Sequence, residues 1–492
     1  MSLLAPILLV PLVAGLACLL VPSRRVMAGL SVLAFGLVLA LGIALIHQVL
    51  EGGVVTEWGE FLYADALSAW MVLVTSVVSL ASAIYAAGYL RRDLAGGAVT
   101  ERRFREFYVL TPLFAAGMFL VVLANNLGVM WFAVEATALS SVLLVALYNR
   151  RTSLEAAWKY IILGSLGLAL ALFGTVFVYA AAVGPHASDK LPSFNWSRLM
   201  TVAPQFDHGL IKLAFVFAFI GYGTKAGLAP MHTWLPDAHS EAPSPTSAML
   251  SGVSLKIALY ALLRFHILTT ACLGTPFSQH LLLGFGLLSM CVAAPFILVQ
   301  TNVKRLFAYH SLEHVGIMCV GFGLAAPLAV FGAVLHIGYH ALVKSTIFFA
   351  AGNIHQKYHC LELPSLGAGL LQTMPASSTL LALAVIAIAG LPPFGIFLTE
   401  FSIVAGGMQA GHPLACGLFV AALLTVFSGL LSHVAHLLLG TAERQPGGPS
   451  TPISCVAAMA LLIAVLAVFS IWLPKPLLQL ITQAASIIRG IP

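Results

Sequence analysis

Long apolar runs recur along the whole chain and are separated by short polar or charged connections. Most runs contain about 20 residues, the length of helix that crosses roughly 30 Å of bilayer hydrocarbon. The pattern therefore predicts an all-α polytopic membrane protein with about 14 transmembrane helices. The predicted spans are residues 3–21, 27–50, 66–90, 107–124, 127–148, 157–183, 210–229, 246–268, 280–300, 305–324, 328–354, 374–391 (continuing, broken, to 409), 412–439 and 453–473.

The two ends of the chain differ from the spans between them. The run over 3–21 has no basic residue before it and no small-residue cleavage site after it. We therefore interpret it as a retained first helix rather than as a signal peptide. The tail over 474–492 is short, and we expect it to lie at the membrane interface.

The basic residues are distributed unevenly among the predicted loops. With the N-terminus outside, 14 of the 23 lysines and arginines fall in inner loops, 5 fall in outer segments and 4 lie inside or near spans. Inner loops of membrane proteins carry the excess of positive charge, so this distribution supports 14 spans with both termini outside. The net charge of +6 thus follows membrane topology and gives no indication of nucleic-acid binding.

The composition excludes several classes of function. Hydrophobic residues make up 60% of the chain and charged residues 8%, against about 25% charged in soluble domains, so we expect no separate soluble domain. The seven cysteines are dispersed, which argues against an iron–sulfur cluster or a zinc ribbon. Neither a dinucleotide-binding glycine motif nor a P-loop occurs. We therefore expect no cofactor in this chain.

Two of the predicted spans are interrupted by similar sequences. Span 7 ends with Ala-Gly-Leu-Ala-Pro at 226–230, and Ala-Gly-Leu-Pro-Pro at 389–393 breaks span 12. The two sites are five spans apart, and an odd offset makes the two units enter the membrane in opposite directions. This arrangement is typical of inverted-repeat transporters with paired broken helices.

Five ionisable residues lie within the apolar spans, although each charge at the bilayer centre costs roughly 2.5–3.5 kcal/mol. Left unpaired, the five would cost on the order of 15 kcal/mol, so we expect them to face protein, one another or water. One interpretation is a set of buried ion pairs that fixes the packing. The interpretation that we favour is a set of proton-transfer groups. The residues are Glu135, Lys225, Lys256, Lys344 and Glu400.

The position of one lysine at a helix break favours the second interpretation. Lys225 directly precedes the Gly/Pro interruption of span 7. A broken helix frees backbone carbonyls and admits water, which is tolerated in a membrane only where the segment is buried in protein or lines a cavity. A lysine there can stay partly hydrated and change partners.

Histidines on two spans extend the pattern. Each row shares one helix face, because its members are separated by three or four residues. Imidazole, carboxylate and desolvated lysine can all titrate near neutrality, so the rows suit a hydrogen-bonded proton path. The spacing also suits a metal ion, but one face continues to a lysine, which repels cations, so we expect no metal. The rows are His336, His340 and Lys344, and His310, Glu313 and His314.

Other polar residues have less specific interpretations. Asp65 begins span 3 and is interpreted as a helix N-cap. Arg264 and Lys212 lie near span ends, from which long basic side chains reach the interface by snorkelling. A further group at the inner ends of spans 7 and 8 is either a proton entrance or a solvated loop. It consists of His232, Asp237, His239 and Glu241.

Five long motifs contain the buried ionisable residues. They are WFAVEATALSSVLL (131–144), GYGTKAGLAPMHTWLPDAHSEAPSPTSAMLSGVSLKIALYALLRF (221–265), KRLFAYHSLEHVGIM (304–318), GAVLHIGYHALVKSTIFFAAGNI (332–354) and AGLPPFGIFLTEFSIVAGG (389–407). These motifs resemble those of the antiporter-like membrane subunits of respiratory complex I and the related membrane-bound [NiFe] hydrogenases. The resemblance covers about residues 65–435.

The resemblance implies a repeat architecture and roles for the buried residues. Spans 4–8 and 9–13 become two inverted five-helix repeats with broken helices 7 and 12. Glu135 is implied to pair with Lys225, Lys256 to lie on the connecting path, and span 11 to lead outward to Glu400. That last position is lysine in one branch of the family and glutamate in another. The implied division is a three-span segment over 1–106, the repeats over 107–268 and 279–439, and a last span with its tail over 440–492.

The motifs SLEHVGIM and PDAHSEAPSPTSAMLSG look closest to the hydrogenase-4 component F type, which accompanies membrane-bound [NiFe] hydrogenases and formate hydrogenlyases. The resemblance implies a bacterial or archaeal inner-membrane protein that transports protons, or Na⁺, and has no redox chemistry of its own. Its partners would be lipids, other membrane subunits and a peripheral arm with nickel–iron and iron–sulfur centres. The alternatives are a subunit of an NADH–quinone oxidoreductase, a subunit of a multi-subunit Na⁺/H⁺ antiporter, and a coupling-inactive scaffold.

Overall fold

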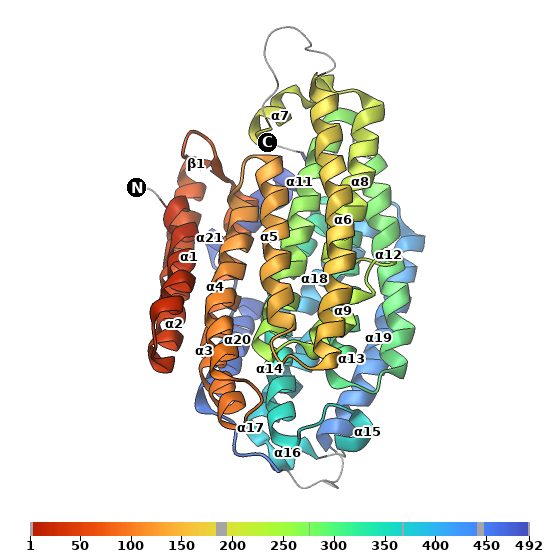
Figure 1. Ribbon diagram of the computed structural model, residues 1–492. Helices are drawn as coiled ribbons and strands as arrows, with labels where there is room; N and C mark the ends of the chain where they lie inside the picture. Colours follow the sequence, from red (N-terminus) through yellow and green to blue (C-terminus); the bar gives the residue numbers. More distant parts are fainter. Residues whose placement is uncertain (1–2, 184–193, 275, 367–368, 440–446, 491–492) are drawn as a thin grey trace.

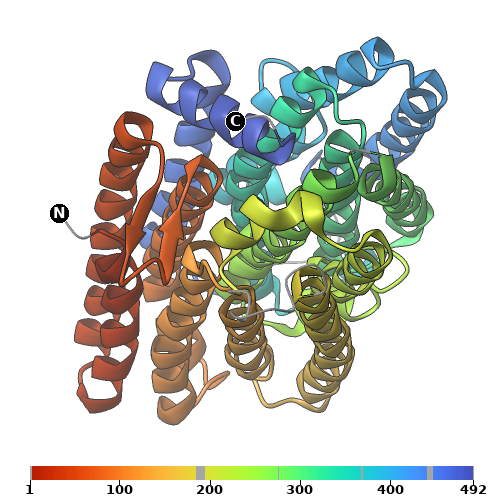
Figure 2. The same cartoon turned by 90° about the horizontal axis from the view of Figure 1, so that it is seen from above.

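The computed structural model describes residues 3–183, 194–274, 276–366, 369–439 and 447–490. Most helices run along one direction and form an elongated bundle (Figure 1). Seen from above, the red N-terminal helices lie at one edge of this bundle (Figure 2). The helices are α1 (Leu4–Leu20), α2 (Arg24–Gly52), α3 (Ala66–Ala95), α4 (Glu101–Leu123), α5 (Leu127–Val145), α6 (Arg151–Val183), α7 (Trp196–Val202), α8 (His208–Ala226), α9 (Trp234–Glu241), α10 (Ser244–Met249), α11 (Leu255–Leu273), α12 (Pro276–Val299), α13 (Val303–Gly323), α14 (Pro327–Tyr358), α15 (Leu363–Leu366), α16 (Leu370–Thr373), α17 (Pro375–Ile388), α18 (Gly395–Gln409), α19 (Pro413–Leu439), α20 (Ile453–Ile471) and α21 (Lys475–Ile488).

The helices account for the apolar pattern of the sequence. Within the described residues, 11 helical segments are long and apolar enough to cross a membrane, and α1 and α17 are shorter apolar helices. Every predicted span coincides with helical structure, so the all-α polytopic class is confirmed. The predicted span over 305–324 corresponds to α13, which is not among the 11. The count of 14 spans and the division into repeats stay predictions.

A short hairpin between α2 and α3 is the one two-stranded sheet in the described part of the chain. Strands β1 (Val55–Glu57) and β2 (Leu62–Ala64) pair antiparallel. The hairpin also closes the start of α1, because the carboxylate of Glu57 accepts hydrogen bonds from the backbone N–H groups of residues 3, 4 and 5 at 2.6, 2.9 and 3.0 Å. The first N–H groups of a helix have no partner inside the helix, and a carboxylate there is favourable.

A buried ion pair connects α3 to α11. As predicted, Asp65 is the N-cap of α3 and accepts from the Ser68 N–H at 2.9 Å. Its two carboxylate oxygens also accept hydrogen bonds from the guanidinium of Arg264, at 2.7 and 2.8 Å. The prediction that Arg264 snorkels to the interface is wrong, because its side chain is 3% exposed and its guanidinium packs on the Trp196 ring. A carboxylate and an aromatic ring solvate the cation inside the protein, so it need not reach water.

Loss of one partner of this pair should weaken the fold. Burial tends to raise the pKa of Asp65, but the adjacent Arg264 guanidinium reverses this and lowers the pKa below its ordinary value. Asp65→Asn should therefore destabilise the protein by roughly 3–5 kcal/mol, because it leaves a buried arginine unpaired. Thermal unfolding in detergent measures the change. The stabilisation should be complete above the unfolded pKa and be lost as the pH falls through the lowered folded pKa.

A matched control comes from a surface pair. Glu101 and Arg24 also form an ion pair, but both side chains are more than half exposed. Glu101→Gln should leave the unfolding temperature nearly unchanged, because exposed pairs contribute little. Equal behaviour of the two variants would contradict the structural role of Asp65.

The two predicted helix breaks have the same local construction. Gly227 ends α8 with φ +80°, and the Leu228 N–H bonds back to the Gly223 carbonyl at 2.9 Å. Gly390 follows α17 with φ +65°, and the next N–H, of Leu391, reaches back five residues in the same way. A left-handed residue at this position closes a helix, and only glycine adopts it without strain. Polar side chains lie beside both breaks.

Glycines allow α12 to approach α13 closely. A Cβ atom at Gly316 would lie 2.7 Å from the carbonyl oxygen of Gly286, and one at Gly286 would lie 2.8 Å from the Val320 nitrogen. Real Cβ atoms are not found at such distances, so any side chain would force the helices apart. This packing fixes α13, the helix that carries His310, Glu313 and His314.

The predicted interfacial tail contains an amphipathic helix. The apolar residues of α21 are buried on one side and pack against α3 and α14. Its other side carries exposed residues. The helix has a proline, Pro476, in its first turn, where the missing N–H is not needed. Its position relative to a membrane stays a prediction.

Candidate functional site

Ionisable side chains lie inside the bundle in two groups joined by a central lysine. The first group surrounds Lys225 at the end of α8, which is 1% exposed. Its ammonium donates a hydrogen bond to the hydroxyl of Tyr160 on α6. The Tyr160 hydroxyl lies 2.7 Å from the hydroxyl of Ser141 on α5. Three helices thus meet at the lysine through hydroxyl groups.

The helix break also shapes this site. Trp234, the first residue of α9, stacks on the Tyr160 ring with centroids 4.6 Å apart. Its indole N–H donates at 2.8 Å to the carbonyl of Thr224, in the last turn of α8. The segment after the break therefore holds the tyrosine against the lysine. Tyr160 and Trp234 were missed by the sequence analysis, although W-L-P-D stands within a quoted motif.

Glu135 does not pair with Lys225 in this structure. One of its oxygens accepts from the Ser165 hydroxyl at 3.1 Å. The other oxygen is buried and has no hydrogen-bond partner among the described residues. The ion pair implied by the family resemblance is thus not formed here, since the Lys225 ammonium donates its hydrogen bond to the Tyr160 hydroxyl instead. The lysine and the carboxylate each keep bonding capacity for another partner.

The central lysine, Lys256, lies at a local change of helix type. Residues 250–254 form one turn of π-helix between α10 and α11. The Lys256 ammonium donates to the Ser251 carbonyl within this turn, and the side chain is fully buried. The Ser251 hydroxyl lies 2.8 Å from that of Ser311 on α13. A π turn widens the helix and frees carbonyls, and such turns are frequent at functional sites.

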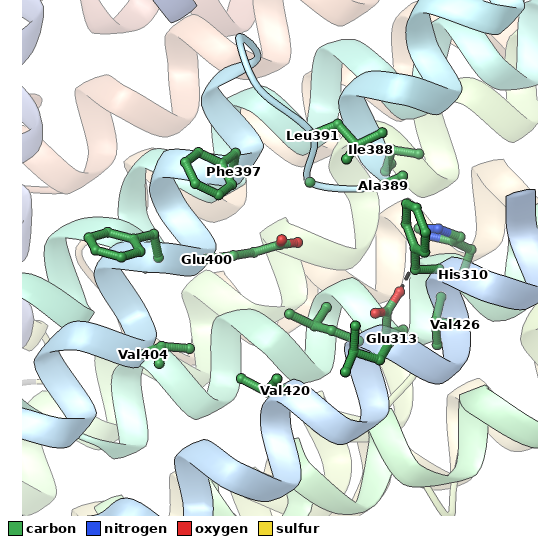
Figure 3. Close-up of a pocket in the computed structure, with 15 residues that line it drawn as sticks. His310, Glu313, Ile388, Ala389, Leu391, Phe397, Glu400, Val404, Val420 and Val426 are labelled. Carbon is green, nitrogen blue, oxygen red and sulfur yellow. Dashed lines mark ion pairs between the residues drawn. The ribbon is translucent and has the colours of Figure 1, made fainter.

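The second group borders a cavity of about 380 Å³ between α13, α17, α18 and α19. Figure 3 shows the carboxylates of Glu400 and Glu313 pointing into it from opposite sides, with His310 beside Glu313. The remaining wall is mostly apolar and includes Phe397. Glu400 is 8% exposed. Two nearly buried carboxyl groups therefore share one small space.

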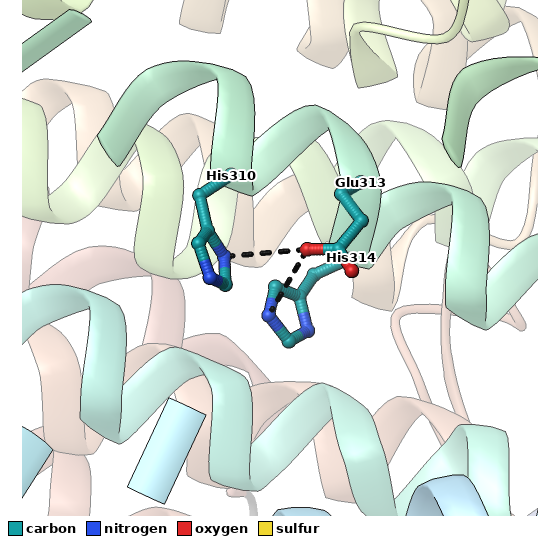
Figure 4. A group of neighbouring side chains, drawn as sticks. All are labelled: His310, Glu313 and His314. Carbon is teal, nitrogen blue, oxygen red and sulfur yellow. Dashed lines mark ion pairs between the residues drawn. The ribbon is translucent and has the colours of Figure 1, made fainter. Parts of the chain in front are cut away.

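On α13, the carboxylate lies between two imidazoles. Glu313 Oε2 is 3.4 Å from His310 Nδ1 and 3.7 Å from His314 Nε2 (Figure 4). All three residues are at most 1% exposed. None of these three atoms has a hydrogen-bond partner within the described ranges. The cluster can therefore take up a further proton or another cation.

The row on α14 continues from this cluster. His336 Nε2 is 2.9 Å from His314 Nδ1, and the ring centroids of His340 and His314 are 4.8 Å apart. One turn further, the Lys344 ammonium donates to the Phe307 carbonyl of α13 at 2.9 Å. The α14 row and the α13 row are thus in direct contact. Their sequence spacing could predict each row, but not the contact between them.

Glu400 lies close to the same imidazoles. A carboxylate oxygen of Glu400 and one nitrogen each of His314 and His336 all lie within 4.8 Å of one another. One water molecule with hydrogen bonds of about 2.8 Å spans such a distance. A Cβ atom at position 390 would collide with the Glu400 carboxylate, so Gly390 also leaves room for this side chain.

The predicted entrance residues separate into surface and buried groups. Asp237 forms ion pairs with Lys159 at 3.1 Å and Arg305 at 2.6 Å, and Glu241 accepts from Thr152 at 2.8 Å. These bonds are typical of a solvated end of the bundle. Whether the segment is a proton entrance stays a prediction.

Two histidines of the same segment lie deeper. His232 is 8% exposed, and burial lowers its pKa. His239 is fully buried and stacks on Phe348 with centroids 5.1 Å apart. Burial, followed by the positive charge of Lys344, lowers the pKa of His239 to about 3. The His239 ring is therefore neutral at physiological pH.

Two sets of side chains offer the donor atoms of a metal site. One is His310, Glu313 and His314, and the other is His314, His336 and Glu400. Histidine and carboxylate donors in this number suit zinc. However, Lys344 and Lys256 lie within electrostatic reach of His314, and a protonated lysine there opposes a divalent cation. The expectation that the chain binds no metal stays a prediction.

Two family models match the chain. The model described as NADH:quinone oxidoreductase/Mrp antiporter, TM, matches residues 124–425. The model described as NADH-Ubiquinone oxidoreductase (complex I), chain 5 N-terminus, matches residues 59–97. The larger match includes both interrupted helices and every residue of the two groups described above.

Relatives with similar sequences carry several names. The chain is 39% identical over 395 residues to the hydrogenase-4 component F homolog of Methylacidiphilum infernorum, and the match covers 80% of this chain and 82% of that one. It is 30% identical over 444 residues to NADH-quinone oxidoreductase subunit N of Desulforudis audaxviator, and the match covers 87% of this chain and 83% of that one.

Solved structures have the same fold. A chain of the Mrp complex from Dietzia superimposes with a TM-score of 0.86 at 21% identity, covering 99% of this chain and 97% of that one. A chain of respiratory complex I from Thermus thermophilus superimposes with a TM-score of 0.75 at 25% identity, covering 95% and 97%. Both are chains within multi-subunit membrane complexes.

Proposed function

Because the chain belongs to the NADH:quinone oxidoreductase/Mrp antiporter family of membrane subunits, we propose that it transports protons within a membrane-bound redox complex. The proposed complex is of the membrane-bound [NiFe] hydrogenase or formate hydrogenlyase type. The 39% identical hydrogenase-4 component F homolog supports this choice. The chain performs no redox chemistry itself, and a partner arm with nickel–iron and iron–sulfur centres supplies the energy.

One observation carries the proposal: buried ionisable groups follow one another through the bundle while most lack a fixed counter-ion. Lys225, Lys256 and Lys344 each donate to a hydroxyl or a backbone carbonyl, and none has an ion pair among the described residues. Groups that serve only packing are normally paired, because an unpaired buried charge is costly. Groups that exchange protons need capacity for a second partner.

The proposed direction of transport follows the two interrupted helices. Protons would enter from the inner side near Asp237 and His239, pass Lys225 and Lys256, and leave through the His336–Lys344 row and Glu400. The protein would lie in a bacterial or archaeal inner membrane with both termini outside. Na⁺ as the transported ion, and a scaffold without transport, are the alternatives that an experiment must separate.

The composition of the purified complex tests the hydrogenase assignment. Affinity purification of the chain from its own host should recover a large subunit with nickel and iron–sulfur metal, measured by elemental analysis. Recovery of a flavin-containing arm would favour an NADH–quinone oxidoreductase. Recovery of small membrane proteins without any redox metal would favour a Na⁺/H⁺ antiporter, the type for which a 25% identical relative in Bacillus subtilis is named.

Glu135→Gln should slow proton transport in vesicles roughly tenfold, which corresponds to about 1.4 kcal/mol. The change keeps size and shape but removes the negative charge that attracts the Lys225 ammonium when the two approach. Acidification of reconstituted vesicles, read with a pH-sensitive dye, measures the rate. Glu135→Asp should do less harm.

An exposed carboxylate provides the control. Glu155 on α6 pairs with Lys159 at the surface, and Glu155→Gln should leave the rate unchanged. Full activity of both Glu135 variants would assign the residue to packing and remove it from the path.

A further inference from the structure

Four side chains from three helices form a continuous line in the second group. Thr399 Oγ1 on α18 lies 2.8 Å from His336 Nδ1 on α14. His336 Nε2 lies 2.9 Å from His314 Nδ1 on α13, and His314 Nε2 lies 3.7 Å from Glu313 Oε2. All four side chains are at most 1% exposed. Thr399 lies within the motif over 389–407, but its residue type alone indicates no role.

The threonine hydroxyl determines which atoms donate. Its oxygen also lies 2.7 Å from the backbone carbonyl oxygen of Ile396, one turn earlier in α18. Two oxygens approach this closely only when a proton lies between them. A hydroxyl has one proton, so the Thr399 proton points to Ile396 and Oγ1 accepts from the Nδ1–H of His336.

The tautomer of His336 determines the tautomer of His314. A neutral imidazole has one N–H, so His336 with a proton on Nδ1 has a bare Nε2. That atom accepts from Nδ1–H of His314, and the Nε2 of His314 is bare in turn. The bare nitrogen faces Glu313 Oε2 at 3.7 Å, too far for a direct hydrogen bond, and neither atom has a hydrogen-bond partner in the part of the chain that the structure describes.

We propose that Thr399 is a positioning residue that holds the His336–His314 pair in the tautomer that accepts protons only from the Glu313 side. The inference rests on the proposed function in its transport aspect, but the tautomer itself does not depend on transport. It makes the line directional, because its other end stops at a hydroxyl whose proton is engaged with the backbone.

The proton count balances through the pair. A proton carried by Glu313, or by water beside it, adds to His314 Nε2, and the Nδ1 proton of His314 then passes to His336 Nε2. His336 cannot release its Nδ1 proton into Thr399, so it returns the Nε2 proton to an acceptor. We assign Glu400 as that acceptor, because one of its carboxylate oxygens lies within 4.8 Å of one nitrogen of each imidazole. One proton enters, one leaves, and His336 regains its starting tautomer.

His314 must then reset before the next proton. It is left with a proton on Nε2 and a bare Nδ1, which faces the bare Nε2 of His336. Two facing acceptors are unfavourable, so the tautomer held by Thr399 also drives His314 back. The reset moves a single proton: it leaves Nε2 for the Glu313 carboxylate and reaches Nδ1 through a water molecule, so that His314 neither gains nor loses a proton.

The tautomer can be observed directly by ¹⁵N solid-state NMR of the ¹⁵N-histidine-labelled protein at a pH where the rings are neutral. The signals of His314 are assigned as those lost in His314→Gln. We expect the wild-type ring to be protonated on Nδ1. In Thr399→Val a large share of His314 should move to the Nε2–H form, and Thr399→Ser should restore the wild-type spectrum.

Thr346→Val provides the matched control. Thr346 is a fully buried threonine on α14, and its hydroxyl bonds to the carbonyl one turn earlier, at 3.0 Å. This variant should leave the His314 spectrum unchanged. A wild-type His314 protonated on Nε2, or a spectrum that Thr399→Val does not alter, would overturn the inference.

Transport provides the second measurement. Thr399→Val should slow proton transport about tenfold, the equivalent of one hydrogen bond, and change its pH profile, whereas Thr399→Ser and Thr346→Val should not. The other ionisable groups facing the pair, which contribute to that profile in all variants alike, are His310, His340, Lys344, Lys256 and Glu400.

The two measurements separate two kinds of failure. An altered tautomer in Thr399→Val with an unchanged transport rate overturns the directional role of Thr399. If even Lys225→Ala leaves transport unchanged, the proposed function is wrong, while the NMR result still decides the tautomer.

Discussion

Lys225→Ala is expected to abolish proton transport through this subunit while the complex still assembles. The Lys225 ammonium is the buried cation at the interrupted end of α8, and Tyr160 is its hydrogen-bond partner. Removing a proton-transfer group of an enzyme typically costs 10²–10⁴-fold in rate. We therefore expect a loss of roughly 10²-fold or more, measured as dye-reported acidification of vesicles that contain the assembled complex.

The fold should tolerate this change. Alanine keeps the helix and removes a charge whose insertion costs roughly 2.5–3.5 kcal/mol. Native gel electrophoresis should therefore show the complex at normal abundance. Lys212→Ala is the matched control, because Lys212 lies on the same helix but is exposed at its other end. Normal pumping by an assembled Lys225→Ala complex would contradict the proposed role of Lys225 as a proton-transfer group.

Tyr160→Phe distinguishes the lysine from its partner. The variant keeps the ring that stacks on Trp234 and removes only the hydroxyl that accepts a hydrogen bond from the Lys225 ammonium. If the hydroxyl holds the lysine away from Glu135 in one state of a cycle, its loss should change the rate less than loss of the lysine. An effect as large as that of Lys225→Ala would make the tyrosine a member of the path.

The sequence could predict the helices and the rows of polar residues on them. Apolar runs of membrane length, a glycine at each helix break and a four-residue spacing on α14 all have local physical causes. For this reason the interrupted ends of α8 and α17, and the shared face of His336, His340 and Lys344, follow from the chain itself.

Contacts between helices could not be predicted in the same way. Arg264 looked like an interfacial residue because its position was judged from distance to a span end, whereas Asp65 lies 199 residues away in the sequence. Tyr160 and Thr399 look like ordinary helix residues until the fold places them beside Lys225 and His336. The π turn before Lys256 likewise has no reliable sequence signal.

The Glu135–Lys225 pair shows a different limit. The family resemblance implied a partner for each residue, but one structure contains one arrangement, and here the two side chains bond to Ser165 and Tyr160. A group that exchanges partners in a transport cycle cannot be assigned a single contact from sequence. The unsatisfied oxygen of Glu135 is the part of this arrangement that is consistent with such an exchange.

Glu400→Gln should block transport at the exit while leaving the inner half of the path able to take up protons. Glu400 lies on α18 beyond the second helix break and within 4.8 Å of the His314 and His336 nitrogens. A proton that leaves against about 150 mV needs roughly 3.5 kcal/mol. A carboxylate can accept the proton from an imidazole and release it when its surroundings change, whereas an amide cannot carry it.

The measurement is the transport rate in vesicles, with a loss of roughly 10²-fold or more expected. Glu362→Gln is the control, because that carboxylate is exposed and bonds to Asn302 at the surface. Glu400→Lys should keep part of the activity, since a lysine in the same cavity can also carry a proton. The cavity beside Glu313 gives the longer side chain room. Transport at the wild-type rate in Glu400→Gln would show that protons leave the His336–Lys344 row by another route.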